Sequence, residues 1–363
     1  MEQSAAVEWF HELKSEVPRF LDSLQGEKNK GFYRYSLTGD LNRSEEWGLG
    51  NSVFAAKNYY MLNALTSELK KNISEFILQF QDPTGYIFDP YIAHQSRLRR
   101  VVFSFRSRNF NNLFNEQTKR AETRQSFAAL RCVDSRPDVP YMQIPYTKEL
   151  IREYIYKLKW ATPWEAGSHL SHLAFFLMNN YRMFDVHSED INELVDYAFE
   201  VVNEFRQTDG AWYDASQAVP KTEKVNGAMK LITALSAAEK TDLDNVNALI
   251  DLCLSTLNEG HACNHFNIIY VLSNCHKKSE YRAEEIQQYC LERLDMYKEY
   301  YWSEYGGFSF FKRKANSIYY NAKISSGKQE PDIHGTSLLL WGIVLISDVL
   351  QMRKKIGFNF PYT

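Results

Sequence analysis

The sequence predicts an all-α protein built from repeated helical hairpins. Three observations support this fold class: apolar residues recur at helical spacing along most of the 363 residues, charged and apolar segments alternate, and similar glycine-aromatic turns separate them. Six segments of each kind alternate strictly. Such a pattern describes an (α/α)6 toroid, in which six outer helices wrap a barrel of six inner helices, and we expect one domain over residues 1–363.

The predicted outer helices are amphipathic and charged, as expected of helices with one face in water. Within residues 188–206, for example, Ile191, Leu194 and Ala198 recur at helical spacing with acidic residues between them. The six outer segments are residues 6–23, 67–80, 147–158, 188–206, 241–257 and 283–299.

The predicted inner helices are richer in small and apolar residues. The segment from Ser337 to Ile346 is apolar nearly all round, which a helix tolerates only when other helices enclose it. The six inner segments are residues 47–65, 122–132, 165–179, 223–236, 261–273 and 333–350.

Three connections before inner helices contain a glycine followed by an aromatic residue, at Gly85, Gly210 and Gly306. Glycine lets the chain turn with a positive φ, and the aromatic side chain packs against the neighbouring hairpin. We expect the flanking aspartates mainly to shape these turns. They are Asp82, Asp89, Asp209 and Asp214.

Two connections are long, residues 81–121 and 300–332, and we expect both near the mouth of the barrel. The first contains a basic stretch, which we interpret as a solvated loop or as a lid that attracts an anionic substrate. Its basic residues are Arg97, Arg99, Arg100, Arg106, Arg108, Lys119 and Arg120.

Composition excludes several classes of protein. With 42 Lys and Arg against 45 Asp and Glu, the chain gives no overall reason to expect a nucleic acid partner. The longest apolar stretch, Ser337 to Leu350, is too short to span a bilayer. Five cysteines scattered among predicted helices suit reduced thiols. We therefore expect a soluble cytoplasmic protein, and the oligomeric state stays open.

The toroid, the glycine-aromatic turns and the last hairpin resemble the superfamily of terpenoid cyclases and protein prenyltransferase β-subunits. The β-subunits hold a catalytic zinc with an Asp-x-Cys motif and a later His, and the matching positions read His261-Ala-Cys263 and Asp332-Ile-His334. This resemblance implies zinc bound by His261, Cys263 and His334. The same architecture resembles six-hairpin glycan-processing enzymes, which place catalytic acids and aromatic platforms at one mouth of the barrel and for which we expect no cofactor.

Polar residues gather at the starts of the predicted inner helices, among them Glu122 and Glu165. Glu165 lies beside aromatic residues and one turn before His169, so it acts either as a general acid or simply as a complement to the helix dipole. Asp332 either caps the last inner helix or completes a carboxylate pair with Glu165. His334 is a candidate base, hydrogen-bond donor or metal ligand.

The leading hypothesis is an enzyme of glycoside hydrolase, lyase or epimerase type that acts on a polar saccharide, with Glu165, Asp332 and His334 as catalytic residues. The first alternative is a zinc-dependent prenyltransferase-like or cyclase-like enzyme. The second is a toroidal binding protein without catalysis. The predicted substrate-binding residues are Trp47, Arg124, Gln125, Trp164, His169, Trp212, Asn226 and Tyr320.

Overall fold

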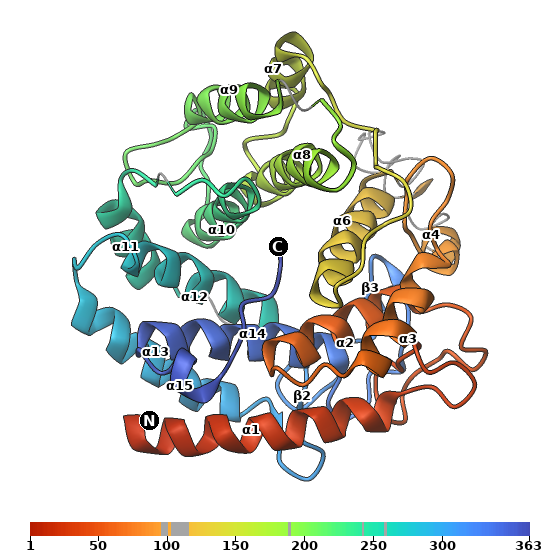
Figure 1. The fold of residues 1–363 in the computed structure, drawn as a ribbon. Coiled ribbons are helices and arrows are strands. Elements are labelled where there is room, and N and C mark those ends of the chain that lie inside the picture. Colours follow the sequence, from red (N-terminus) through yellow and green to blue (C-terminus); the bar gives the residue numbers. More distant parts are fainter. Residues whose placement is uncertain (96–100, 103–115, 188–189, 242, 258–259) are drawn as a thin grey trace. The chain divides into compact units, whose positions relative to one another are not determined.

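The computed structural model describes residues 1–95, 101–102, 116–187, 190–241, 243–257 and 260–363, which are predominantly α-helical (Figure 1). These residues form two compact units. Unit 1 comprises Met1–Asp138, Leu291–Ser347 and Gln351–Tyr362, and unit 2 comprises Val139–Cys290 with Asp348–Leu350 and Thr363. The expectation of a single closed domain stays a prediction.

Each predicted outer segment contains a helix, so this part of the prediction is confirmed. The local sequence explains where two of these helices begin. The hydroxyls of Thr66 and Thr147 accept hydrogen bonds from backbone amides in the first turns of their helices, at 3.2 and 3.3 Å. The helices in the predicted outer segments, which keep the name outer helices below, are α1 (Gln3–Leu24), α3 (Ser67–Leu78), α7 (Lys148–Tyr156), α9 (Ile191–Asn203), α11 (Val246–Leu254) and α13 (Ala283–Lys298).

The predicted inner segments are helical as well. Pro163 opens one of them at its first position, where the missing amide hydrogen has no cost. The helices in the predicted inner segments, which keep the name inner helices below, are α2 (Leu49–Met61), α6 (Glu116–Cys132), α8 (Pro163–Phe184), α10 (Lys221–Ala237), α12 (Ala262–His276) and α14 (Ile333–Val349).

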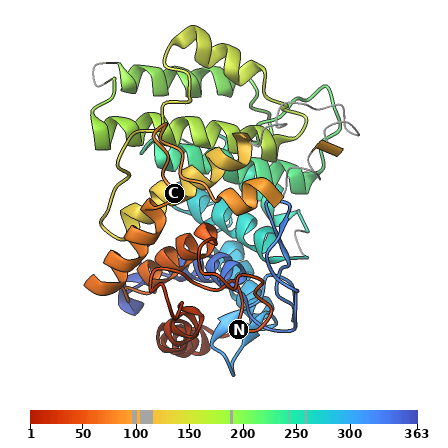
Figure 2. The same ribbon diagram turned by 90° about the vertical axis from the view of Figure 1, so that its right-hand side faces the viewer.

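In unit 2 the inner helices pack on one another in chain order. Helix α10 packs against both α8 and α12, while α9 packs against α7 and α8, and α11 against α12 (Figure 1 and Figure 2). The close approach of α8 and α10 requires Gly167 and Gly227. A Cβ atom on Gly227 would lie 2.6 Å from the side chain of Pro163, and one on Gly167 would lie 2.7 Å from that of Leu231.

In unit 1, α2 packs against α6 and α3.

The connection before α14 forms two antiparallel hairpins that the helical periodicity does not reveal. One pairs β1 (Tyr301–Trp302) with β2 (Gly307–Phe308), and the other pairs β3 (Ile318–Tyr319) with β4 (Ala322–Lys323). The first hairpin packs on α1, where the Trp9 ring meets Tyr301 and Phe308 edge-on at 5.9 and 6.1 Å. Two short helices, α4 (Pro90–Gln95) and α15 (Arg353–Ile356), complete the unit.

The glycine-aromatic turns are confirmed. Gly85, Gly210 and Gly306 have φ of +91°, +81° and +78°. The aspartates Asp82, Asp209 and Asp214 accept hydrogen bonds from backbone amides two residues further on, at 2.8, 3.1 and 2.9 Å.

Several expectations concern residues outside the described ranges. Arg97, Arg99, Arg100, Arg106 and Arg108 all lie there, so the lid hypothesis is not addressed. In the described ranges, no helix is both long and apolar enough to cross a bilayer. The five cysteines are all described, and no disulfide joins them.

The tight packing of Gly306 in the third glycine-aromatic turn can be tested by comparison with Gly357. Gly306 and Gly357 share a φ of +78°, but a Cβ on Gly306 would lie 2.5 Å from the backbone oxygen of Glu16, whereas one on Gly357 would meet only the flexible end of Lys14 at 3.1 Å. We expect Gly357→Ala to lower the free energy of unfolding by about 1–2 kcal/mol through strain. Gly306→Ala should lose about 1–3 kcal/mol more through the clash. Urea denaturation measures both, and equal losses would contradict the packing described here.

Candidate functional site

The start of helix α14 in unit 1 is organised by the buried carboxylate of Asp332. Its Oδ1 accepts the Gly335 amide at 2.7 Å, which makes it the cap of the helix. Its Oδ2 accepts the amides of Phe310 at 2.8 Å and Asn316 at 3.2 Å. Burial raises the pKa of Asp332 to about 7, against the lowering effect of these amides. Because backbone amides occupy both of its oxygens, we assign Asp332 to capping and not to direct contact with substrate.

A second buried carboxylate, Asp40, fixes the neighbouring loop. It accepts hydrogen bonds from the amides of Tyr35 and Asn42, the latter at 2.6 Å, and burial raises its pKa to about 6. The Ile333 amide donates to the Tyr35 carbonyl at 3.0 Å. The side chain of Tyr35 also hydrogen-bonds Asp332, which lowers the pKa of that carboxyl. Tyr35 is therefore held in place by both acids.

His334 lies in the first turn of α14 among aromatic rings. Its imidazole stacks on Phe54 at 4.5 Å between ring centroids, meets Phe310 at 4.9 Å, and meets Tyr319 edge-on at 5.8 Å. The Tyr35 hydroxyl lies 3.5 Å from Nδ1. We call these five residues the His334 cluster. His334 and Tyr319 are half-buried, whereas the other three side chains are buried.

Tyr319 reaches the cluster from the β3–β4 hairpin. The hairpin turns at Tyr320 and Asn321, whose φ of +45° and +66° suit a two-residue turn, although a positive φ strains a bulky tyrosine. The Tyr319 ring lies against Gly50, where a Cβ atom would be only 2.8 Å away. Burial and the neighbouring charges of Tyr320 and Glu122 raise the pKa of Tyr319 well above its usual value.

Glu122 on α6 is a buried acid whose charge acts on Tyr319 of this cluster. Its Oε2 accepts the Asp89 amide at 3.0 Å, and the Asp89 carboxylate in turn accepts the amides of Gly48 at 2.6 Å and Leu49 at 3.2 Å at the start of α2. Within the described ranges, Oε1 of Glu122 is buried without a hydrogen-bond partner. Burial and then the charge of Asp89 raise the pKa of Glu122 well above its usual range, which favours the protonated form of its carboxyl group.

The inner helices α2 and α6 bury other polar groups. Ser52, Asn58 and Ser126 are buried, and their side-chain oxygen and nitrogen atoms have no hydrogen-bond partner among the described residues. Buried polar atoms in proteins nearly always have a partner, either protein or water. This interior therefore suits water or a polar ligand.

Three predicted substrate-binding residues also lie in unit 1. Trp47 is half-buried and stacks on Tyr91 with ring centroids 3.9 Å apart. Arg124 is buried on α6, and Gln125 accepts a hydrogen bond from the buried Lys57. Arg124 and Gln125 therefore belong to the same helix as Glu122.

Unit 2 holds Glu165, His169 and Asn226. Glu165 is half-buried in the first turn of α8 and accepts a hydrogen bond from the Thr162 hydroxyl at 3.4 Å. His169 lies one turn further along the same helix and is half-buried. Asn226 accepts a hydrogen bond from Asn267 at 2.8 Å. Because Glu165 belongs to unit 2 and Asp332 to unit 1, the carboxylate pair stays a prediction.

The two predicted tryptophan platforms of unit 2 differ in exposure. Trp164 is 48% exposed, with the Lys230 ammonium 5.5 Å from the centre of its ring. Trp212 is only 2% exposed: its Nε1 donates to Asn203 at 3.1 Å and the Arg206 guanidinium covers its ring. Because of these contacts we assign Trp212 to packing within its turn, and the proposed site does not include it.

The residues implied as zinc ligands are divided between the units. His261 and Cys263 lie at the start of α12 in unit 2, whereas His334 lies in unit 1. Burial lowers the pKa of His261. Nowhere in the described ranges do three His, Cys, Asp or Glu side chains form a group that could hold a metal ion.

Comparisons with known proteins give no further guide. No protein-family model matches the chain, and no curated protein is significantly similar to it. The function must therefore be argued from the residues themselves.

Sequence reasoning placed Glu122 at the start of an inner helix but did not single it out. The signal that could have singled it out is an acidic residue in a predicted inner helix, where most residues are small or apolar. It considered Tyr319 and Tyr320 as a pair that either lines the pocket or packs in the core, and it missed Tyr35 and Phe54, because partners so far apart in sequence leave no local pattern.

Asp332 should make stability depend on pH. Burial raises its pKa above the ordinary 3.8, so the stability it contributes is complete below about pH 4 and is lost as the pH rises to about 7. Asp332→Asn removes this titration, while Asp40 and Glu122 titrate in both proteins. The advantage of the wild type over the variant should therefore shrink by up to about 4 kcal/mol, since one pH unit is worth about 1.4 kcal/mol. Urea denaturation at several pH values measures this difference, and a constant difference would contradict the assignment.

Proposed function

We propose that the protein is a glycan-processing enzyme that acts on a polar saccharide by acid-base chemistry at the His334 cluster. The proposal rests on Glu122, a buried acid with one oxygen without a partner among the described residues and with a pKa raised well above its usual range. Perturbed acids of this kind are concentrated at functional sites. The proposed setting is the cytoplasm, in keeping with five free thiols in the described chain.

The proposed roles follow from the chemistry of each group. Glu122 keeps a proton that it can donate to a leaving oxygen, as a general acid does. His334 is the base, oriented by the Tyr35 hydroxyl at Nδ1 and by stacking on Phe54. Tyr319 lies near both groups: the Glu122 carboxyl group contributes to the raised pKa of its phenol, and its ring meets His334 edge-on.

The unsatisfied polar atoms of α2 and α6 favour a saccharide over a hydrocarbon. Saccharide hydroxyls can serve as donors and acceptors for Ser52, Asn58 and Ser126, whereas a hydrocarbon would leave these groups unpaired at a cost of about 1–3 kcal/mol each. The stacked pair of Trp47 and Tyr91 supplies an aromatic face of the kind that sugar rings contact. The basic stretch within residues 97–120 is the reason to include anionic saccharides.

We also propose the (α/α)6 toroid as the architecture behind this site. Its support is the alternation of outer and inner helices and the packing of successive inner helices within each unit, α2 on α6 and α10 on both α8 and α12. In such a toroid the inner helix starts would gather at one mouth, with Glu165 among them. The proposal for unit 1 does not depend on that closure.

Isoprenoid cyclisation is a second candidate because of the aromatic rings around His334. Phe54, Phe310 and Tyr319 offer π faces that stabilise cations, and a neutral carboxylic acid such as Glu122 can protonate an alkene. Incubation with squalene or farnesyl diphosphate, followed by mass spectrometry of the products, tests this candidate. A cyclised product would replace the glycan proposal.

Replacement of Glu122 should abolish most turnover. The assay presents polygalacturonate, alginate, hyaluronan, xylan and mannan to the wild type and detects new reducing ends or unsaturated products. On the glycan that is converted, Glu122→Gln should lower kcat by about 100-fold or more, because a general acid contributes about that much.

Glu165→Gln tests the other general acid that the sequence predicts, and under this proposal it lowers kcat less than Glu122→Gln does. The reverse pattern would move the general acid to Glu165. Binding of a glycan without any turnover would support the alternative of a non-catalytic binding protein.

Tyr319→Phe separates chemistry from packing. The substitution keeps the ring against Gly50 and His334 but removes the hydroxyl, so the expected result is a kcat lowered by about 10-fold or more with KM nearly unchanged. Steady-state kinetics measures both constants. A change in KM alone would show that the hydroxyl binds the ground state and takes no part in the chemistry.

A further inference from the structure

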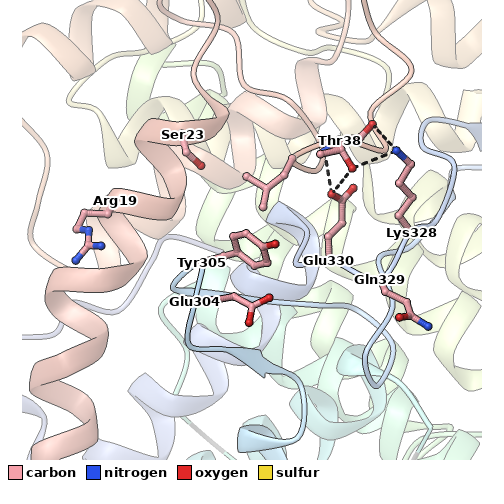
Figure 3. A pocket seen from close by; sticks show the side chains of 9 residues that line it. Arg19, Ser23, Thr38, Glu304, Tyr305, Lys328, Gln329 and Glu330 are labelled. Atoms are coloured by element: carbon pink, nitrogen blue, oxygen red, sulfur yellow. Dashed lines mark hydrogen bonds between the residues drawn. The ribbon is translucent and has the colours of Figure 1, made fainter.

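A cavity of about 600 Å³ lies in unit 1, apart from the residues of the His334 cluster (Figure 3). Its walls come from α1, the loop that follows α1, the β1–β2 turn and the segment just before α14. The volume lies within the range of about 300–1,000 Å³ typical of small-molecule sites. The side chains that matter for its chemistry are Arg19, Thr38, Glu304, Tyr305, Lys328 and Gln329.

One wall of the cavity is firmly built. The buried carboxylate of Glu330 accepts hydrogen bonds from the Thr38 amide at 2.8 Å, the Thr38 hydroxyl at 2.9 Å and the Gly39 amide at 2.7 Å. The Lys328 ammonium donates to the Thr38 hydroxyl at 3.2 Å (Figure 3). A ligand would therefore meet a wall that needs little rearrangement, which reduces the entropic cost of binding.

An aromatic side chain is presented to the cavity by the third glycine-aromatic turn. Tyr305 is 44% exposed, and its amide donates to the Trp302 carbonyl at 3.0 Å. Gly306 follows with φ +78°. In Figure 3 the Tyr305 ring lies between α1 and the wall formed by Thr38 and Glu330. The turn thus holds a flat apolar surface inside a polar cavity.

The charges around the cavity compensate one another. Arg19 pairs with Glu16 at 2.8 Å, Lys328 bonds Thr38, and both oxygens of Glu330 are occupied. The Glu304 carboxylate and the Gln329 amide make no hydrogen bond through their side chains within the described ranges, so they can bind a ligand. An anion would meet Glu304 unfavourably, whereas hydroxyl groups can pair with both side chains.

We propose that this cavity binds one or two sugar units of a neutral glycan. The Tyr305 ring contacts the apolar face of a sugar, and Glu304 and Gln329 pair with its hydroxyls. The site is separate from the proposed catalytic cluster, so it would hold a second part of the glycan or a regulatory sugar. Its ligand class rests partly on the proposed function, but its residues do not.

Saturation-transfer NMR and calorimetric titration test the proposal with maltotriose, cellotriose, xylotriose and mannotriose as probes. We expect at least one trisaccharide to bind the full chain, and Tyr305→Ala to weaken that binding about tenfold or more, equivalent to about 1.4 kcal/mol. Gln329→Ala, which removes a side chain that makes no hydrogen bond within the described ranges, should weaken it as well. The matched control is Tyr281→Ala, which removes a tyrosine 40% exposed in unit 2 and should leave binding unchanged.

The outcomes separate this inference from the proposed function. Binding that Tyr305→Ala abolishes but Glu122→Gln and His334→Ala leave intact supports the cavity site, even if no turnover is found. Binding that depends on His334 and not on Tyr305 overturns the cavity site and leaves the proposed function standing. Failure of all four probes to bind with a Kd below about 10 mM also overturns it.

Discussion

The buried carboxylate of Asp332 is the interaction on which the candidate site depends. A single side chain caps α14 and accepts hydrogen bonds from the amides of Phe310 and Asn316, in the segment that joins the two preceding hairpins. It also receives a hydrogen bond from Tyr35, whose hydroxyl approaches Nδ1 of His334. Three segments that are distant in sequence thus converge on one buried acid. The position of the imidazole follows from this convergence, because α14, the hairpins and the Tyr35 loop share one anchor.

Buried acids recur in this unit with two different kinds of environment. Asp332, Asp40 and Asp89 are surrounded by backbone amides, which offset part of the cost of burying a carboxylate. Glu122 accepts only one amide and faces the charge of Asp89, and both its burial and that charge raise its pKa. The contrast separates acids whose oxygens organise the backbone from an acid with an oxygen left for other chemistry.

Much of the helical framework could be predicted from the sequence because amphipathicity and turn signals are local. All twelve predicted helical segments contain a helix, and Gly85, Gly210 and Gly306 adopt the expected positive φ. The hairpins within residues 300–332 escaped prediction because strands of two residues are too short for a period of two to be visible. Trp212 was expected as a platform, but exposure depends on neighbours, and Arg206 covers its ring.

The sequence by itself determined the all-α class, the order of outer and inner helices and the residue types available at the helix starts. Each of these depends on contacts within a few residues. Only the tertiary structure decided that Glu122 is buried with one oxygen unpaired among the described residues, that Asp332 is a cap, and that Tyr35, Phe54 and Tyr319 surround His334. A pKa depends on burial and on charges brought from elsewhere in the chain. No local pattern of residues records those distances.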